Sequence, residues 1–404
     1  MATKQTIVEQ ECVVHATPDV VYTVLTSAAD LVGWLCNEAR CEPIAGGIYE
    51  LRWLSGYAVH GRVVAAERPR TLTVAWHGTG EPGETTVTFT VAPHSDGARV
   101  MVQHRGFGRG ERWSKAIEEA RKGWAGSLEC LQHLVETGID LREARRPLIG
   151  VTVGAPLTPE LIAREGIDTT AGVYLEGVID GLSAQAAGLR ARDVITSVDG
   201  TAVDGHIALL TLMQRHRAGD HVVVEVVRGR EHLTVDIELK ARPIPELPLE
   251  PNLLLATLLE RYEKARTDMV KALAGASEEQ AGRAPAEDEW SAREVLAHLS
   301  IVERDVHYWL GQMILGYEEA RTTGNPATLP ERLSAVLAAA PTVAALQNRF
   351  AHDQADTLAI VGALRPEIVA NRARYRRIAQ TIFDLADHVH DHVRQAKAAL
   401  AAAR

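Results

Sequence analysis

Residues 181–189 read Gly-Leu-Ser-Ala-Gln-Ala-Ala-Gly-Leu, and Asp193-Val194-Ile195 and Val198-Asp199-Gly200 follow shortly after. Upstream, Gly150 breaks the apolar run 147–151, and a glycine there lets successive backbone N–H groups form a concave nest suited to a carboxylate. A threonine and a proline open a short helix over 158–166. Strands are predicted at 172–175 and 222–227. The stretch therefore belongs to a small β-rich domain.

These motifs resemble the PDZ domains attached to HtrA-type bacterial proteases. PDZ domains bind a protein C-terminal or internal peptide as an added strand, so main-chain bonds give affinity and pockets give selectivity. The resemblance implies a carboxylate loop and strand formed by Leu148, Ile149, Gly150 and Val151. It implies a second groove wall on a helix over 207–216, with the following residues nearest the ligand: Ile207, Leu210 and Met213 or Gln214.

The protease itself is not expected, because no GNSGG-like nucleophile motif is present and Ser183 reads as a turn residue. A groove filled from within the chain, or a domain that serves only as a spacer, is the alternative to peptide binding.

Apolar residues alternate with polar ones in four segments before this domain, which predicts an antiparallel sheet with one buried face. The four segments are 49–53, 71–76, 86–91 and 99–104. Thr17 and Pro18 open a short helix, and apolar residues at helical spacing predict a long helix over 111–136. The fold class of this part is α+β.

The order of motifs in this part resembles the START-like, SRPBCC superfamily, in the branch related to the activator of the heat-shock-protein-ninety ATPase. The motifs are Thr17-Pro18-Asp19-Val20-Val21-Tyr22, Trp34, Gly46-Gly47, Gly61-Arg62-Val63-Val64, Trp76 and Gly123-Trp124. The family folds as a helix grip around a cavity, which implies an apolar small molecule as ligand. The candidate lining residues are Trp34, Trp53, Trp76, His104 and Trp124. Ordinary core packing is the alternative for this aromatic set.

The last part of the chain changes to helical periodicity after a proline-rich linker at 243–250. Helices are predicted at 252–275, 291–317, 341–363 and 371–402, which makes an all-α four-helix bundle. Ser291 and Glu294 form a capping box that fixes the phase of the second helix.

Three histidines are candidate metal ligands in this bundle. His388 and His392 share one face of the last helix at spacing i, i+4, and His298 lies two turns into the second helix. Three neutral imidazoles hold a divalent ion and leave positions open for water or substrate. The neighbouring Asp387 and Asp391 are either outer-sphere partners of the histidines or solvated groups.

The segments around these histidines resemble the DinB family of metal-binding four-helix proteins. The segments are Trp290-Ser291-Ala292-Arg293-Glu294-Val295-Leu296-Ala297-His298-Leu299 and His388-Val389-His390-Asp391-His392-Val393-Arg394-Gln395. The resemblance implies zinc, nickel or iron. Some relatives are thiol-dependent transferases or isomerases, and because the bundle has no cysteine, a low-molecular-weight thiol would have to arrive as a cosubstrate.

Composition limits the classes of partner. The chain has 404 residues and a net charge of −10, which argues against nucleic acid, and it has no apolar run long enough to cross a membrane. The expected location is the cytoplasm, with the four cysteines reduced. The expected domains are 1–145, 146–242 and 251–404, joined by the linker at 243–250.

Two functions fit these features. The first is a binding or regulatory protein that combines the cavity, the peptide groove and the metal site, and it is preferred because no set of nucleophile, base and orienting group is visible. The second is a metal-dependent thiol S-transferase, isomerase or hydrolase acting at the three histidines. Catalytic residues beyond the metal ligands are unknown, and whether the protein is an enzyme stays open.

Overall fold

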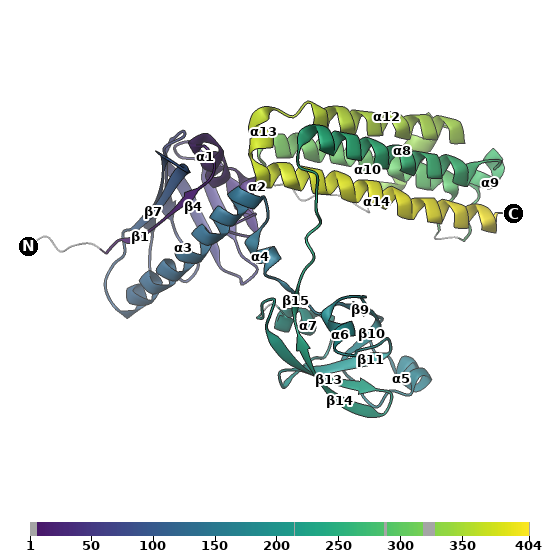
Figure 1. The fold of residues 1–404 in the computed structure, drawn as a ribbon, viewed down its shortest axis with the longest axis horizontal. Coiled ribbons are helices and arrows are strands. Elements are labelled where there is room, and N and C mark those ends of the chain that lie inside the picture. Colours follow the sequence, from purple (N-terminus) through teal and green to yellow (C-terminus); the bar gives the residue numbers. More distant parts are fainter. Residues whose placement is uncertain (1–5, 214, 287–288, 318–327, 404) are drawn as a thin grey trace, which may run out of the picture. The chain divides into compact units, whose positions relative to one another are not determined.

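The computed structural model describes residues 6–213, 215–286, 289–317 and 328–403. The chain divides into two compact units, of which the first combines the residues up to Asp140 with those from Glu246 onward. The second unit is Leu141–Pro245. Each unit is described by itself below (Figure 1).

The N-terminal part of the first unit contains a seven-stranded antiparallel sheet in the order β1-β7-β6-β5-β4-β3-β2. The strands are β1 (Val8–Val14), β2 (Glu38–Cys41), β3 (Ile48–Arg52), β4 (Ala58–Glu67), β5 (Thr71–Trp76), β6 (Thr85–His94) and β7 (Gly97–Arg105). Strands β1, β2 and β4 go beyond the four that sequence alternation predicts. Buried positions alternate along β6, as expected for a sheet with one face in the core.

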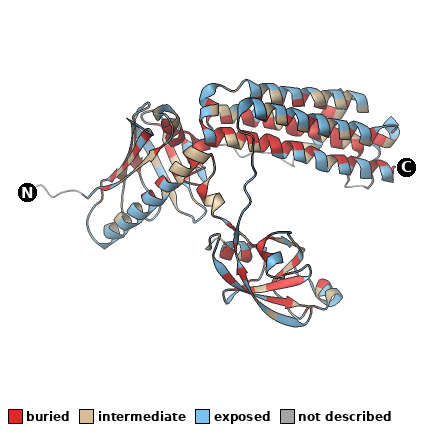
Figure 2. Cartoon of the chain, viewed as in Figure 1, coloured by how far each residue is buried: buried red, intermediate tan, exposed pale blue. Residues whose placement is uncertain are grey.

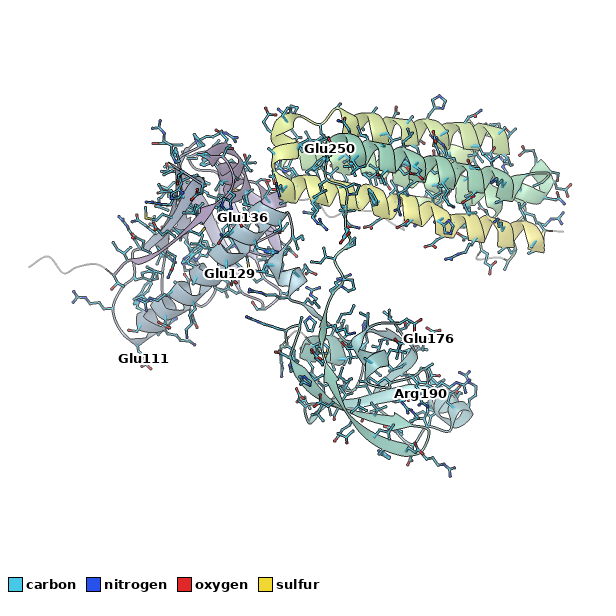
Figure 3. All side chains as sticks on the ribbon, in the orientation of Figure 1. Glu111, Glu129, Glu136, Glu176, Arg190 and Glu250 are labelled. Atoms are coloured by element: carbon cyan, nitrogen blue, oxygen red, sulfur yellow. The ribbon has the colours of Figure 1, made fainter. Side chains whose placement is uncertain are left out.

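Three helices accompany this sheet: α1 (Pro18–Thr26), α2 (Ala28–Leu31) and α3 (Glu111–Thr137). The Thr17 side chain accepts a hydrogen bond from the Val20 N–H, which confirms the predicted start of α1. Helix α3 contacts β1 and buries one face, while its other face is exposed (Figure 2). Figure 3 labels Glu111 and Glu136 near the two ends of α3. The predicted long helix is therefore confirmed.

The second unit carries a sheet in the order β14-β13-β11-β10-β9, with β12 paired to β11, and a separate pair of β8 and β15. The strands are β8 (Pro147–Leu148), β9 (Val151–Val153), β10 (Val173–Val178), β11 (Asp193–Val198), β12 (Thr201–Ala202), β13 (His221–Arg228), β14 (Glu231–Glu238) and β15 (Lys240–Ala241). The helices are α5 (Pro159–Glu165), α6 (Ser183–Ala186) and α7 (His206–Met213), and α4 (Leu141–Ala144) precedes the domain.

The rest of the first unit is a helical bundle built on α8 (Pro251–Leu273), α10 (Ala292–Leu315), α12 (Val343–Gly362) and α14 (Arg372–Ala402). Helix α10 contacts α12 and α14, and α8 contacts the same two helices. Shorter helices α9 (Glu278–Gly282), α11 (Leu329–Ala339) and α13 (Pro366–Ala370) complete the described bundle. Helix α11 has no counterpart among the four helices predicted from the sequence.

The helices of this bundle bury aliphatic side chains in two core clusters, one around Leu296 and one around Leu310. In the described part of the chain, no single helix is long and apolar enough to cross a membrane. A sharply bent pair, α11 with α12, satisfies the same criterion of length and composition.

Candidate metal centre and ligand cavity

The start of α10 fixes the position of His298. The Ser291 hydroxyl accepts a hydrogen bond from the Glu294 N–H at 3.3 Å, and the Glu294 carboxylate accepts one from the Ser291 N–H at 2.8 Å. The predicted capping box is thus confirmed. With the helix phase set there, His298 lies on the side of α10 that meets α14.

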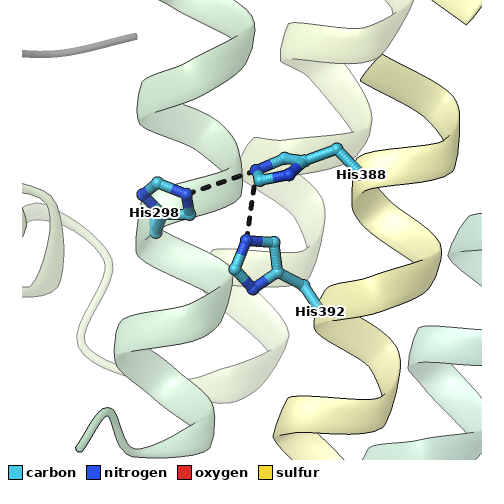
Figure 4. A group of neighbouring side chains, drawn as sticks. All are labelled: His298, His388 and His392. Atoms are coloured by element: carbon cyan, nitrogen blue, oxygen red, sulfur yellow. Dashed lines mark hydrogen bonds between the residues drawn. The ribbon is translucent and has the colours of Figure 1, made fainter. Parts of the chain in front are cut away.

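The three predicted histidines converge between α10 and α14 (Figure 4). The Nε2 atoms of His388 and His298 are 3.4 Å apart, and those of His392 and His388 are 3.1 Å apart. A tetrahedral ion with metal–nitrogen bonds near 2.05 Å separates neighbouring nitrogens by roughly 3.3 Å. These two separations fit a divalent transition metal, and ligand nitrogens of all three residues lie within 4.8 Å of one another.

Hydrogen bonding prepares one of these rings for ligation. The Oε1 atom of Gln395 lies 2.7 Å from Nδ1 of His392. Because an amide oxygen only accepts, Nδ1 of His392 carries the proton and its Nε2 presents a lone pair to the centre of the site. The ring of Trp290 closes one side, with its centroid 4.6 Å from that of His298 and 6.2 Å from that of His392.

Burial also keeps the site in the charge state that a metal needs. It lowers the pKa of His298 to about 3, with further lowering by His392, His388 and Arg332. Burial lowers the pKa of His392 as well, against the opposing effect of its bond to Gln395. Both rings are therefore neutral near pH 7, which is the form of histidine that binds metals.

The acidic residues beside the pair form hydrogen bonds with arginines. Asp387 accepts a hydrogen bond from Arg261, and Asp391 accepts one from Arg394 at 2.7 Å. His390, between the two ligands in sequence, is exposed. The alternative of solvated groups thus describes Asp387 and Asp391 better than a role behind the ligands.

A cavity of about 760 Å³ lies in the N-terminal part between the sheet and α3. Of the five predicted lining residues, Trp53, Trp76, His104 and Trp124 lie along it. Trp34 lies in the core instead, where its ring meets Phe89 edge-on and its indole N–H donates to the Val24 carbonyl.

Small residues on α3 explain why space remains under the helix. Ala116, Ala120, Gly123 and Ser127 line the cavity at helical spacing, so the helix lies over the aromatic wall without filling the space with large side chains. Two polar lining residues, Tyr57 and Glu81, were not among the sequence candidates. They lie outside the alternating strands, so periodicity carried no signal for them.

The tautomer of His104 follows from its partners. The Trp124 indole N–H can only donate, so Nδ1 of His104 accepts this bond at 3.2 Å. Nε2 then carries the proton and donates to the Thr85 hydroxyl at 2.7 Å. Burial lowers the pKa of His104 to about 4, so the ring is neutral near pH 7.

The residues predicted to form the two walls of a peptide groove lie at the start of β9 and on α7 of the second unit. Strand β9 is the last strand in its sheet among the described residues, so its outer edge offers backbone groups to an added strand. Ile207 and Leu210 of α7 are 74% and 45% exposed, as a groove wall requires. Gln214 lies outside the described residues.

The loop before β9, which is predicted to bind the peptide carboxylate, is held by hydrogen bonds within the domain. Gly150 has a φ of 82°, which favours glycine, and Val151 begins β9. The Leu148 backbone pairs with Lys240, whereas the Ile149 side chain is buried and its carbonyl accepts from the Ala184 N–H at 2.7 Å. These bonds fix the loop, and they do not involve the outer edge of β9.

Comparison with protein families decides the identity of the three parts. Residues 15–136 match the family described as Activator of Hsp90 ATPase homolog 1-like protein, residues 138–239 match the PDZ domain, and residues 261–396 match the DinB superfamily. The chain is a three-domain protein of AHSA1-like, PDZ and DinB type. The order and the fold classes predicted from the sequence are therefore confirmed.

Curated relatives share the PDZ part of this three-domain chain. The periplasmic serine endoprotease DegP of Salmonella typhimurium is 26% identical over 118 residues, which are 29% of this chain and 25% of that protein. The serine protease Do-like HtrA of Lactococcus lactis is 40% identical over 70 residues, 17% of each chain. The three-domain chain thus spans about a quarter or less of the length of these relatives.

Solved structures resemble about a third of the chain. Protein MLL2253 from Mesorhizobium loti is 24% identical, with 32% of this chain and 96% of that chain covered and a TM-score of 0.30. The Aha1 dimer from Colwellia psychrerythraea is 18% identical, with 32% and 96% covered and a TM-score of 0.29.

Proposed function

We propose that this protein binds a divalent ion of zinc, nickel or iron at His298, His388 and His392, as part of a binding and regulatory protein. In this proposal the AHSA1-like cavity takes an apolar small molecule, and the PDZ groove takes a C-terminal or internal peptide. The convergence of three imidazole Nε2 atoms between α10 and α14 carries the proposal.

The chain's own residues define what such a centre offers. Three protein nitrogens leave at least one coordination position for water or another ligand, where the metal would act as a Lewis acid. The Gln395 side chain holds His392 in the ligating tautomer, and Trp290 shields one side of the rings from solvent. These groups favour a neutral, preformed ligand set.

A second candidate, a metal-dependent thiol S-transferase, isomerase or hydrolase, has one supporting observation. Within the described part of the chain the candidate ligand set has three members, which is the number of protein ligands in catalytic zinc sites. Turnover of electrophiles with low-molecular-weight thiols by the metal-loaded protein, lost in His388→Ala, would favour this candidate. A flat response across thiols and electrophiles would favour the binding protein.

Metal analysis of the purified full chain tests the main proposal. We expect about one equivalent of metal in the wild type and a loss of at least tenfold in affinity in His388→Ala, because two imidazoles remain. His390→Ala is the matched control, since it removes an exposed histidine from the same helix and should retain the metal. Equally low metal content in wild type and His388→Ala, after loading with each ion, would refute the metal site.

A further inference from the structure

The wall of the N-terminal cavity is aromatic. The rings of Trp76 and Trp124 meet edge to face with centroids 5.4 Å apart, and those of Trp53 and Tyr57 are 5.1 Å apart. All four residues line the cavity. Rings of this kind favour a planar aromatic ligand, which can stack on them or meet them edge to face.

The N–H groups of this wall are already used within the protein. The indole N–H of Trp53 donates to the Leu35 carbonyl at 2.6 Å, and that of Trp76 donates to the Tyr57 hydroxyl at 3.3 Å. Trp124 donates to His104, whose own N–H is bonded to Thr85. The wall therefore offers ring faces and no spare ring N–H donor, so a ligand acceptor buried against it would stay unpaired.

One polar group at the cavity, the Glu81 carboxylate, offers hydrogen-bond acceptors. The Tyr57 hydroxyl lies 2.5 Å from Oε1 of Glu81 and donates its proton there. Oε2 of Glu81 accepts from the Gly78 N–H at 3.2 Å. A carboxylate has about four lone-pair sites, so Glu81 keeps acceptor capacity after these two bonds. The proton of Tyr57 is committed, and the remaining lone pairs of Glu81 are available to a ligand that carries a donor.

We propose that the cavity binds a planar aromatic molecule bearing a hydroxyl or amine group, and that this group donates a hydrogen bond to Glu81. The proposal rests on the proposed function of the cavity and names the chemistry of its ligand. A cavity of about 760 Å³ is large enough for a molecule of several rings.

The charge of Glu81 opposes an anionic group placed beside it. Two cations, Arg112 and Lys115, line it together with two carboxylates, Glu81 and Glu119. Lys115 lies 3.8 Å from Glu119, and Arg112 donates to the Gly80 carbonyl at 3.5 Å. Each cation thus has one polar contact within the protein, and a ligand carboxylate near Glu81 would meet a like charge. A protonated amine gains from both Glu81 and the ring faces.

Three naphthalene probes separate the alternatives by isothermal titration calorimetry on the full chain. 2-Naphthol carries a donor, 2-methoxynaphthalene has the same rings without a donor, and 2-naphthoate carries an anion. We expect 2-naphthol to bind at least tenfold more tightly than each of the other two, because only its hydroxyl pairs with Glu81.

Two variants test whether Glu81 causes the difference in affinity between 2-naphthol and 2-methoxynaphthalene. Glu81→Ala should reduce the advantage of 2-naphthol over 2-methoxynaphthalene to less than threefold, while the affinity for 2-methoxynaphthalene shows that the cavity still folds. Glu84→Ala is the control, because Glu84 is exposed, lies three residues away and does not line the cavity. It should keep the full advantage.

The outcomes separate this inference from the proposed function beneath it. Equal binding of 2-naphthol and 2-methoxynaphthalene to the wild type, or tightest binding of 2-naphthoate, would overturn the donor preference and leave an apolar-ligand cavity. An advantage that survives in Glu81→Ala would overturn the role of Glu81. Absence of binding for all three probes would overturn both this inference and the role of the cavity.

Discussion

Arg374 of α14 forms a buried ion pair with Asp30 of α2, although 344 residues separate them in the sequence. The side chain of Asn371 donates to the same carboxylate at 3.0 Å, and Arg374 also donates to the Ser27 hydroxyl at 2.8 Å. Ser27 in turn donates to the carbonyl of Gly316 at the end of α10. The AHSA1-like and DinB parts are thus joined by a closed polar network.

Removal of the Asp30 carboxylate should destabilise the first unit strongly. Asp30→Ala leaves the Arg374 guanidinium buried without its charge partner, which costs about 3–5 kcal/mol. Denaturant unfolding of the full chain measures the loss, and Glu38→Ala, which removes an exposed partner of Arg52, should change stability far less. The double variant Asp30→Ala with Arg374→Met should recover part of the loss. An unfolding midpoint equal to wild type in Asp30→Ala would show that the ion pair does not form.

Glu303 lies fully buried in the bundle, where its carboxylate accepts from the Thr357 hydroxyl at 2.6 Å. Burial raises the pKa of Glu303 from 4.5 to about 7, against the opposing hydrogen bond from Thr357. The folded protein therefore keeps a proton between these pH values that the unfolded chain has released. Stability contributed by this proton is complete below the unfolded pKa and is lost as the pH rises toward 7.

The loss amounts to about 3 kcal/mol, from 1.36 kcal/mol for each pH unit of the shift. Glu303→Gln has no such proton, so its free energy of unfolding should not show this loss. The difference in free energy of unfolding between Glu303→Gln and wild type should therefore shift in favour of the variant by about 3 kcal/mol from pH 5 to pH 8. Urea unfolding at the two pH values measures the difference, with the exposed Glu260→Gln as the control. Parallel pH profiles of wild type and Glu303→Gln would contradict the raised pKa.

Local sequence patterns predicted the main helices and several strands, but they did not predict contacts between residues far apart in the sequence. The capping box at Ser291 and the i, i+4 pair of His388 and His392 depend on spacing within one helix, so sequence was sufficient. The approach of His298 to them requires the bundle itself, and only a resemblance to DinB proteins suggested it. Nothing local marks Asp30 as the partner of Arg374.

The cavity shows the same division. No sequence pattern separates the roles of Trp34 and Trp53. Trp34 is 1% exposed and packs against Phe89, whereas Trp53 lines the cavity. The position of the cavity depends on the small residues of α3, because they leave space between this helix and the aromatic residues of the sheet. Strand β1 escaped prediction because its exposed and buried positions do not alternate regularly.

The peptide groove proposed for the PDZ part gives the last prediction. Gly150 is a poor test position, since a Cβ there would lie 2.4 Å from the Cβ of Leu182 and its φ of 82° disfavours other residues. Leu210→Lys instead changes an exposed wall residue that the fold does not need. A library of peptides with free C-termini should show selection by the wild type that Leu210→Lys reduces at least tenfold.

The control for the groove is Val223→Lys, which changes a residue that is 43% exposed on β13 rather than on α7 and should leave selection intact. Amidation of a selected peptide should weaken binding by about tenfold, since the backbone N–H groups beside Gly150 would lose a charged acceptor. If free and amidated peptides bind equally, the ligand is an internal segment held by the edge of β9. Absence of any selection by the wild type would instead favour the spacer role, because the edge of β9 and the exposed side of α7 would then bind no peptide.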